Sequence, residues 1–352
     1  MSTKESGTGY GPHIIQSSLP SRYPRGWFCI GADYEFGPQP KRLNYFGSAQ
    51  VSYRGESGQL VVLDAHCPHM GANLADGCVK GDAIVCPFHE WHWGADGVCS
   101  DIPYAKKIPD RARIKSWPVR EVNQLIYLWN DPDGGEPIAE QAIEEDPRIA
   151  QNDWTPWVIR RIDVASNCRE LIDNMADKAH FGPVHGIGEV KHFSNISEGH
   201  TYTQVMTANG PVGELTSTAT YYGPSYMIHH NVSNGSAEYP PREFLSLVIN
   251  VPTGLKSFEF LAGFKEKIPA GLEGDRQAQI DHVNATIEET IERSVFADLK
   301  IWENKVPIDN PILCDGDGPV SRLRQWYQQF LVPIDQVPAS LQQRRIYDKS
   351  DD

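Results

Sequence analysis

The strongest constraint on how this chain folds is the stretch 67–89, which contains two short pairs of cysteine and histidine. Cys67-x-His69 is the first pair and Cys86-x-x-His89 is the second. Thiolates and imidazoles are the side chains that bind soft and borderline metal ions. Two such pairs on separate loops therefore predict a four-ligand metal site in the first third of the chain.

Each of these loops contributes one thiolate and one imidazole, and this mixture indicates the kind of site. Cysteines from both loops can bind one iron while histidines from both bind the other, as in a Rieske [2Fe-2S] centre. Pro68, Gly71 and Pro87 are typical of tight loops, whose backbone N–H groups can donate to the cluster sulfurs. The four residues of the two pairs are therefore our candidate cluster ligands.

Two other metal sites could use a similar set of residues. A structural zinc site usually pairs cysteine with cysteine and histidine with histidine, whereas both pairs here are mixed. A Rieske protein of a membrane complex would carry an additional cysteine in each loop. Those two cysteines would form a disulfide between the loops. Ala72 follows the first loop here and Glu90 and Trp91 follow the second, so this disulfide is absent. The pattern is typical of the Rieske domain of a bacterial oxygenase.

Length, charge and cysteine usage limit the class of protein. The chain has 352 residues, which is room for about two domains, and a net charge of -14. Such a charge argues against nucleic acid as a partner, because phosphate binding needs clustered Lys and Arg. There is no signal peptide and no apolar run long enough to cross a bilayer. We expect no membrane partner and a cytoplasmic location.

The seven cysteines are an odd number, and five of them lie outside the two pairs. Their spacing does not suggest a disulfide framework, which favours free thiols in a reducing compartment. These five are Cys29, Cys78, Cys99, Cys168 and Cys314.

Composition divides the chain into four parts. Residues 1–22 are a polar tail, and 23–132 contain short apolar runs separated by Gly, Pro and Asp turns, which predicts an all-β domain. Residues 133–150 are acidic and rich in Pro and Gly, as expected of a connector. Residues 151–352 alternate β-like stretches with one early and one long late helix. This is an α+β layout, in which strands curled around a helix would enclose an apolar cavity.

The early helix of the second domain contains a further group of polar residues. The pattern D-x-x-H-x-x-x-x-H runs from Asp177 through His180 to His185. On a helix Asp177 and His180 share a face, together with Asn174 one turn earlier. We expect the pair Gly182-Pro183 to end the helix after His180, so that His185 turns back toward the same metal. The alternative is an ordinary solvated helix face.

A facial Fe(II) site has two histidine ligands and one carboxylate ligand, and the late helix contains a candidate for the carboxylate. Asp298 lies on or beside the apolar stripe of this helix, where an ionised carboxylate is costly unless it is paired or bound to metal. It could instead be a boundary residue capped by Arg322 or Arg324. The stripe extends over 279–305 and consists of Ile280, Val283, Ile287, Ile291, Val295, Leu299 and Trp302.

These motifs resemble those of Rieske non-haem iron oxygenases, and most closely the oxygenase components of 3-ketosteroid 9α-hydroxylases. Besides the two Cys/His pairs, the similar segments include DNMADKAHFGPVH, SVFADLKIWENKVPIDNPIL and CPFHEWHWGADGVC. The similarity extends from RYPRGW at 22 to LRQWYQQF at 323. It implies an N-terminal all-β Rieske domain followed by a helix-grip (START-like) catalytic domain with an antiparallel sheet around a long helix.

The resemblance also implies roles for the candidate residues. The two Cys/His pairs would be the ligands of the [2Fe-2S] cluster. His180, His185 and Asp298 would hold a mononuclear Fe(II). Asp177 would be the acid that bridges the two centres, and Asn174 is a further candidate catalytic residue.

The activity implied is that of a terminal oxygenase that hydroxylates a steroid with O2, most simply a 3-ketosteroid at the 9α position. Electrons would come from NADH through a flavin and [2Fe-2S] ferredoxin-type reductase, and they would pass between neighbouring subunits of a head-to-tail homotrimer. Two alternatives remain open. One is a Rieske oxygenase that hydroxylates or demethylates another bulky apolar substrate, and the other is a non-catalytic electron carrier. A carrier would leave the second metal motif without a role.

Two departures from the resemblance concern the substrate. Residues 186–200 are Gly-rich where bulkier apolar residues are expected near the pocket mouth, and the C-terminal sequence suggests a missing or shortened final helix.

Aromatic and apolar side chains of the later strands favour a bulky apolar ligand, although they could instead simply form the core. These residues of the later strands are Tyr221, Tyr222, Tyr226, Met227, Phe244 and Phe258.

Overall fold

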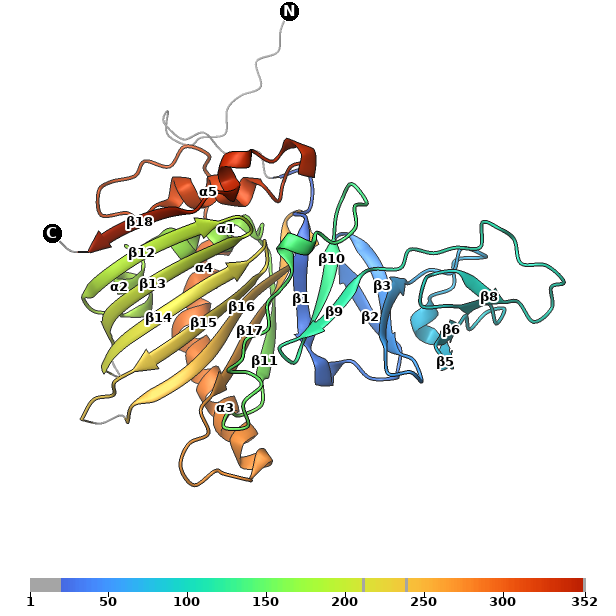
Figure 1. The fold of residues 1–352 in the computed structure, drawn as a ribbon, viewed down its shortest axis with the longest axis horizontal. Coiled ribbons are helices and arrows are strands. Elements are labelled where there is room, and N and C mark those ends of the chain that lie inside the picture. Colours follow the sequence, from blue (N-terminus) through green and yellow to red (C-terminus); the bar gives the residue numbers. More distant parts are fainter. Residues whose placement is uncertain (1–19, 211–212, 238–239, 351–352) are drawn as a thin grey trace, which may run out of the picture.

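The structure is a computed structural model, and it describes residues 20–210, 213–237 and 240–350. A narrow part built of strands lies at one end of the long axis, and a broader part built of strands and helices lies at the other (Figure 1). Most of the predicted N-terminal tail, residues 1–19, lies outside the described residues.

The narrow part consists of antiparallel sheets with the orders β1-β10-β9, β2-β3-β4 and β5-β6-β7-β8. The last of these lies furthest from the broad part (Figure 1). The strands are β1 (Gly26–Ala32), β2 (Lys41–Tyr45), β3 (Ser48–Arg54), β4 (Leu60–Asp64), β5 (Cys78–Lys80), β6 (Ala83–Val85), β7 (His92–Trp93), β8 (Cys99–Asp101), β9 (Val119–Val122) and β10 (Leu125–Asn130).

The turn between β2 and β3 connects the narrow part to the broad one. Phe46 and Gly47 both have positive φ, 55° and 68°, as a two-residue hairpin turn requires. A phenylalanine seldom adopts this conformation, and tertiary contacts hold it here. Its backbone N–H donates to Pro252 O at 2.8 Å, and its ring stacks on Trp117 with centroids 5.8 Å apart.

The broad part is built on one eight-stranded antiparallel sheet with the order β11-β17-β16-β15-β14-β13-β12-β18. Together with the long helix that crosses it, this confirms the predicted fold class. The strands are β11 (Val158–Val164), β12 (Val190–Glu198), β13 (Thr201–Gly210), β14 (Gly213–Tyr222), β15 (Tyr226–Ser233), β16 (Arg242–Gly254), β17 (Ser257–Glu266) and β18 (Arg345–Ser350).

The central sheet is covered on both faces. Tyr226 and Ile228 of β15 belong to a core that also contains Phe28 of β1, so one face packs against the narrow part. Met227, between them, belongs to a second core that includes Ile287 of the long helix. Since side chains alternate along a strand, each central strand contributes to both cores.

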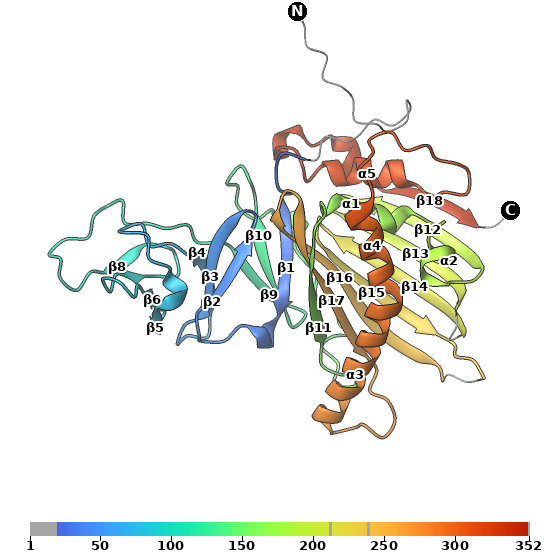
Figure 2. The same cartoon turned by 180° about the vertical axis from the view of Figure 1, so that it is seen from behind.

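The late helix crosses the second face of the sheet, as Figure 2 shows from behind. It consists of α3 (Arg276–Thr290), a π-helical turn (Ile291–Val295) and α4 (Phe296–Asn304). The Asp275 side chain caps its start by accepting from Ala278 N at 3.0 Å. The predicted apolar stripe is confirmed, because its residues are buried or pack against the core around the sheet.

The remaining helices are short. The chain after α5 (Val320–Gln328) forms two 3-10 turns, Ile334–Gln336 and Ala339–Gln342, before it enters β18. This last strand, which the sequence did not predict, pairs with β12. The other short elements are α1 (Arg169–Ile172), α2 (Phe181–His185) and the 3-10 turns Asp33–Glu35, Leu74–Asp76, Ala139–Gln141 and Asp173–Ala176.

One arginine joins the two parts by ion pairs. Arg161 of β11 contacts Glu35 of the narrow part and Glu259 of β17, each at 2.7 Å. Its Nη2 also donates to Ile30 O at 2.8 Å. All three charged side chains are largely buried. This cluster is therefore only partly screened by solvent.

We expect Arg161→Met to lower the free energy of unfolding by about 1–3 kcal/mol, because two partly buried carboxylates lose their counter-ion. Urea denaturation followed by tryptophan fluorescence measures the change. The matched control is Arg42→Met, which removes an exposed pair with Asp76 and should cost less than about 1 kcal/mol. Equal, small losses in the two variants would contradict a stabilising role for Arg161.

Candidate metal centres and substrate cavity

The two loops that contain the Cys/His pairs have the same backbone shape. In each loop the cysteine carbonyl accepts from the N–H four residues later, with Gly71 N to Cys67 O at 2.8 Å and Glu90 N to Cys86 O at 3.1 Å. Gly71 and Glu90 both have positive φ, 81° and 55°. Two loops of different sequence thus present their cysteines in equivalent ways.

The loops bring like ligands together. Cys67 and Cys86 are both 1% exposed, whereas His69 lies at the surface. The imidazoles of His69 and His89 have centroids 4.6 Å apart, and the His69 ring stacks on Trp91. Burial and, to a smaller extent, the neighbouring Cys86 thiol together raise the pKa of the Cys67 thiol to about 11. A thiolate at this position therefore needs a metal cation to be stable at neutral pH.

This arrangement does not fit a single zinc ion. Ligand atoms around tetrahedral zinc lie roughly 3.3–3.8 Å apart, given bonds of about 2.0–2.3 Å. No three ligand atoms of the two pairs, all of them within the described chain, come within 4.8 Å of one another. Thiols meet in the interior and imidazoles near the surface, which suits a cluster with two irons.

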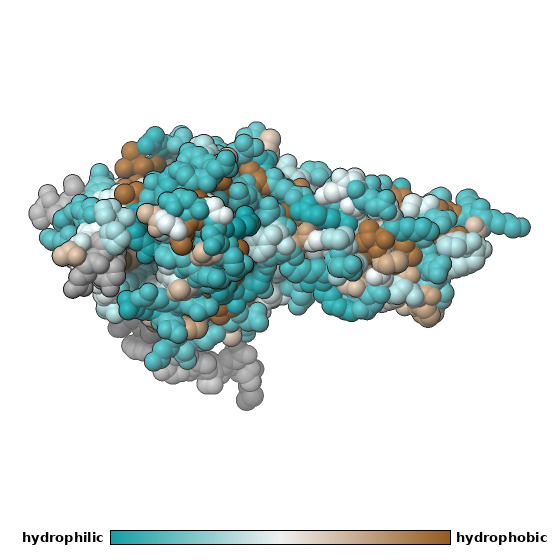
Figure 3. Space-filling view, turned by 90° about the horizontal axis from the view of Figure 1, so that it is seen from below, coloured by the Kyte–Doolittle hydropathy of each residue, from teal (hydrophilic) through white to brown (hydrophobic). Residues whose placement is uncertain are grey.

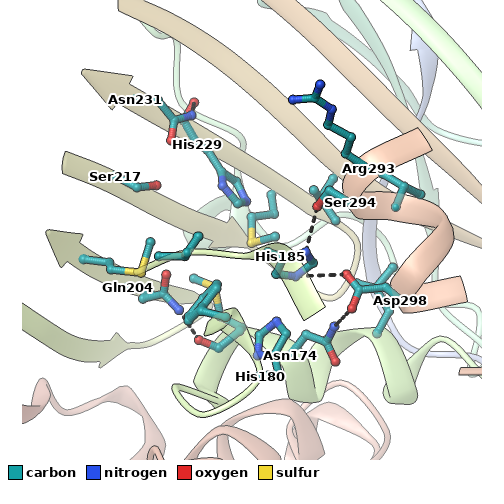
Figure 4. Close-up of a pocket in the computed structure, with 18 of the residues that line it drawn as sticks. Asn174, His180, His185, Gln204, Ser217, His229, Asn231, Arg293, Ser294 and Asp298 are labelled. Carbon is teal, nitrogen blue, oxygen red and sulfur yellow. Dashed lines mark hydrogen bonds and ion pairs between the residues drawn. The ribbon is translucent and has the colours of Figure 1, made fainter. Parts of the chain in front are cut away.

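The second candidate centre is formed by His180, His185 and Asp298, whose ligand atoms all lie within 4.8 Å of one another. The geometry matches the 2-His-1-carboxylate arrangement of non-haem Fe(II) sites. His185 Nε2 lies 3.4 Å from Asp298 Oδ2. Figure 4 shows the imidazoles and the carboxylate gathered at one end of a cavity, beneath the strands of the sheet.

The helix that carries these histidines breaks earlier than predicted. The 3-10 turn Asp173–Ala176 ends at Asp177, whose φ of -87° and ψ of 95° are extended. Gly182 and Pro183 lie inside α2 instead of ending a helix. Pro183 is tolerated there because backbone N–H groups in a first helical turn have no intrahelical partner. The predicted convergence of His180 and His185 is nevertheless seen.

Hydrogen bonds to the outer ring nitrogens orient both imidazoles. His180 Nδ1 lies 2.5 Å from Asp177 O, and His185 Nδ1 lies 2.9 Å from the Ser294 hydroxyl. Both Nε2 atoms are thus left to face the centre, as is usual for metal-binding histidines. Ser294 belongs to the π-helical turn, and such turns are frequent at functional sites. The sequence reasoning missed this residue.

The Asp298 carboxylate is held by an amide, not by an arginine. Asn174 Nδ2 donates to Asp298 Oδ1 at 3.1 Å, and Asn174 Oδ1 accepts from Trp302 Nε1 at 3.2 Å. Arg324 pairs with Asp173 instead, with Nη2 and Oδ2 2.6 Å apart. The alternative of an arginine-capped Asp298 is therefore wrong.

Burial controls the protonation of the triad. It raises the pKa of Asp298 to about 7, because a carboxylate away from water loses its solvation. Burial and, to a smaller extent, the neighbouring His180 together lower the pKa of His185 to about 4. The two imidazoles are therefore neutral and able to bind metal at neutral pH.

Asp177 lies at the edge of this centre with its side chain 38% exposed. Its Oδ1 accepts from Ala179 N at 3.0 Å, and its Oδ2 lies 3.8 Å from His180 Nδ1. The carboxylate therefore adjoins a triad residue from the solvent side.

The triad opens into a cavity of about 350 Å³, within the range of sites for small organic ligands. Of the six side chains proposed as ligand contacts, only Met227 lines it. Tyr221, Tyr226 and Phe258 are at most 1% exposed and belong to the cores. The apolar lining is Leu171, Met175, Phe181, Ile187, Met206, Leu215, Met227, Val248, Phe260, Val295 and Trp302.

Comparison with known proteins agrees with this arrangement. Residues 26–118 match the Rieske [2Fe-2S] domain model, and residues 128–331 match the 3-ketosteroid 9α-hydroxylase C-terminal domain model. A probable 3-ketosteroid-9-alpha-monooxygenase oxygenase component of Rhodococcus rhodochrous is 42% identical over 94% of this chain and 85% of its own length. A 3-ketosteroid-9-alpha-monooxygenase oxygenase component of Mycobacterium tuberculosis is 37% identical over 98% and 91%.

Among solved structures, dicamba monooxygenase bound to dicamba superimposes with a TM-score of 0.72 at 18% identity, covering 88% of this chain and 98% of that one. This likeness concerns the fold alone. Across the described residues, no helix combines the length and apolar character needed to span a bilayer.

A Rieske domain followed by an antiparallel sheet with a long helix and a His-His-Asp cluster defines the chain as a Rieske oxygenase. It belongs to the family of 3-ketosteroid-9α-monooxygenase oxygenase components, to which the sequence resemblance pointed. An oxygenase component works with a reductase that supplies its electrons. The hypothesis of a simple electron carrier is therefore wrong.

Metal binding at the triad should weaken as the pH falls. Below pH 7 the protonated Asp298 carboxyl must release its proton to bind metal, so affinity should fall about tenfold per pH unit. Above pH 7 it should level off, since the imidazoles are already neutral. Cobalt(II) titration of protein depleted of mononuclear metal, followed by visible absorption from pH 5.5 to 8, measures this. A flat profile, or an unchanged slope in Asp298→Asn, would contradict the assignment.

Proposed function

We propose that this protein is a terminal oxygenase that hydroxylates a 3-ketosteroid at the 9α position with O2. One observation carries the proposal, which is the opening of the His180, His185 and Asp298 cluster into an apolar cavity of about 350 Å³. The names of the relatives specify the substrate class. The electrons would come from NADH through a flavin and [2Fe-2S] ferredoxin-type reductase.

The donor sets fit the two metal groups of this proposal. Buried thiols and outer imidazoles suit a Rieske [2Fe-2S] cluster held by Cys67, Cys86, His69 and His89. The clustered carboxylate and neutral imidazoles suit a mononuclear Fe(II). When bound, the cluster supplies single electrons, and the Fe(II) supplies open positions at which O2 is activated.

The protein residues prepare the site for this chemistry. Asn174 holds the carboxylate of Asp298 through one hydrogen bond, and Trp302 holds Asn174 through another. Ser294 fixes the orientation of the His185 ring. The apolar lining excludes water from a bound hydrocarbon and positions it against the triad. In this proposal Asn174 is a positioning residue.

The position of the two centres supports an assembly of several copies. Within one chain the cluster loops and the α2 region lie at opposite ends of the long axis (Figure 1). Electrons can therefore reach the triad readily only from the cluster of another copy. We propose a head-to-tail homotrimer, in which heterologous contacts close into a ring.

Exposed apolar side chains support the same assembly. Met70, Phe88 and Tyr104 are more than half exposed in or near the cluster loops. Figure 3 shows a hydrophobic patch on the face of the narrow part that is seen from below. A second exposed group lies on α4 and the segment after it, beyond the triad, and consists of Phe296, Ile301, Ile312 and Leu313. Two such surfaces at opposite ends suit a heterologous interface.

Two further assignments belong to the proposal. The proposed domain boundaries are 23–132 for the Rieske domain and 151–352 for the catalytic domain, with 133–150 as the connector. The two separate family matches, 26–118 and 128–331, support a division into two domains. A cytoplasmic location is supported by the seven cysteines, all of which are free.

The decisive assay measures NADH-dependent O2 uptake by the iron-loaded protein with a Rieske-type reductase and androst-4-ene-3,17-dione. We expect coupled uptake and a product heavier by one oxygen atom, hydroxylated at C9. His180→Ala should abolish the product while the reduced cluster keeps its Rieske EPR signal. Turnover of small aromatic or other apolar substrates without any steroid product would favour the alternative substrate class.

We expect Asp177→Asn to keep both metal centres but to slow electron transfer between subunits. In the proposed trimer its carboxylate lies beside His180 and accepts a hydrogen bond from a cluster histidine of the neighbouring subunit, and an amide does so less well. Stopped-flow oxidation of the reduced cluster, in the presence of steroid and O2, measures the step. Unchanged cluster oxidation and turnover would exclude the bridging role.

A further inference from the structure

The cavity has a polar patch on its sheet wall. Ser217 of β14 and Asn231 of β15 are directly opposite each other in the antiparallel register. His229 lies two residues before Asn231 on the same strand, so its side chain leaves the same face of the sheet. All three line the cavity, and Figure 4 shows them on strands across from the triad. No role in the proposed chemistry accounts for this patch.

The patch has an unused hydrogen-bonding group. His229 Nε2 is buried and has no hydrogen-bond partner among the described residues. Burial lowers the pKa of His229 to about 4, so the imidazole is neutral at physiological pH. The adjacent His230 faces the opposite side of the sheet and pairs with Glu243 at 2.9 Å. A buried polar group without a partner destabilises the protein unless a ligand satisfies it.

The surroundings of the patch define the ligand group that it fits. The charged or ionisable residues at the other walls, Arg293, Asp298 and the two triad histidines, come from the helical side of the cavity. The sheet wall around the patch includes the apolar side chains of Met206, Leu215, Met227 and Val248. The polar Gln204 of β13 also lines the cavity, but its amide already donates to Met175 O. A neutral polar group on an otherwise hydrocarbon ligand therefore matches this wall, and a ketone oxygen is such a group.

We propose that His229, together with Ser217 and braced by Asn231, is the anchor that binds the C3 ketone oxygen of the steroid. This inference rests on the proposed function, because the C3 ketone is the one polar group that defines the substrate class in the relatives' names. Asn231 Nδ2 donates to Ser246 Oγ at 3.3 Å and to His229 O at 3.5 Å, so Asn231 braces the strand while His229 and Ser217 supply the donors for the ketone. Anchoring the A ring at the sheet would orient the flat ring system toward the triad on the opposite side.

The anchor would also select among substrates. A site that hydrogen-bonds a ligand oxygen rejects analogues without it, because buried polar groups are then left unpaired. His229, Asn231 and Ser217 act on binding and orientation and do not contact the reacting atoms. They are therefore specificity residues and not catalytic ones.

The test combines a change in the protein with a change in the ligand. Affinities of the oxidised holoenzyme for androst-4-ene-3,17-dione and for its 3-deoxy analogue, androst-4-en-17-one, are measured by calorimetry without reductase. We expect the wild type to prefer the diketone about tenfold. In His229→Leu this preference should fall to about twofold, while His229→Gln should keep part of it. Ser217→Ala should reduce the preference as well.

The matched control is His230→Leu, which removes the neighbouring imidazole from the other face and should keep the full preference. Circular dichroism and the Rieske EPR signal verify that each variant is folded. An undiminished preference in folded His229→Leu and Ser217→Ala would overturn the anchor. It would also be overturned if these variants lost instead the preference for the diketone over androst-4-en-3-one, which lacks the C17 ketone. Absence of steroid binding by the wild type would overturn the proposed function itself.

Discussion

The burial of the central sheet on both faces is the constraint on which this structure depends. One face of the eight-stranded sheet packs against the Rieske part, and the other faces the long helix and the cavity. Because side chains alternate along each strand, a shift of one residue would move Tyr226 into the cavity and Met227 into the junction between the parts. Register thus determines the shape of the cavity and the seating of the Rieske domain together.

The same two-sided burial makes the candidate metal centre costly without a cation. A carboxylate and two imidazoles share an apolar cavity, and the hydrogen bonds from Asn174 and Ser294 satisfy only part of their polar surface. In the absence of a cation, burial favours the protonated form of Asp298 and the neutral form of His185. A bound divalent ion would instead favour the ionised form of the Asp298 carboxylate. Binding of a cation would therefore also relieve the free-energy cost of burying these polar groups.

Much of this could be predicted from the sequence, because the informative patterns are local. Loop ligands at fixed spacing and a stripe on one helix depend on near neighbours in the chain. The early helix breaks at Asp177 and not after His180, and Pro183 ends no helix because a first helical turn accepts proline. His229 and the rest of the cavity wall were missed for another reason. Which face of β15 lies toward the helix depends on the packing of distant elements, and periodicity alone does not settle it.

The π-helical turn explains how one long helix can serve both the core and the triad. From Val283 to Leu299 the stripe repeats every four residues, and each such step overshoots a 3.6-residue turn by about 40°. In a regular α-helix the stripe would therefore drift around the helix and away from the sheet. The wider turn at Ile291–Val295 reverses part of this drift. Leu299 and Trp302 thus remain buried, and Asp298 beside them remains directed at the two histidines.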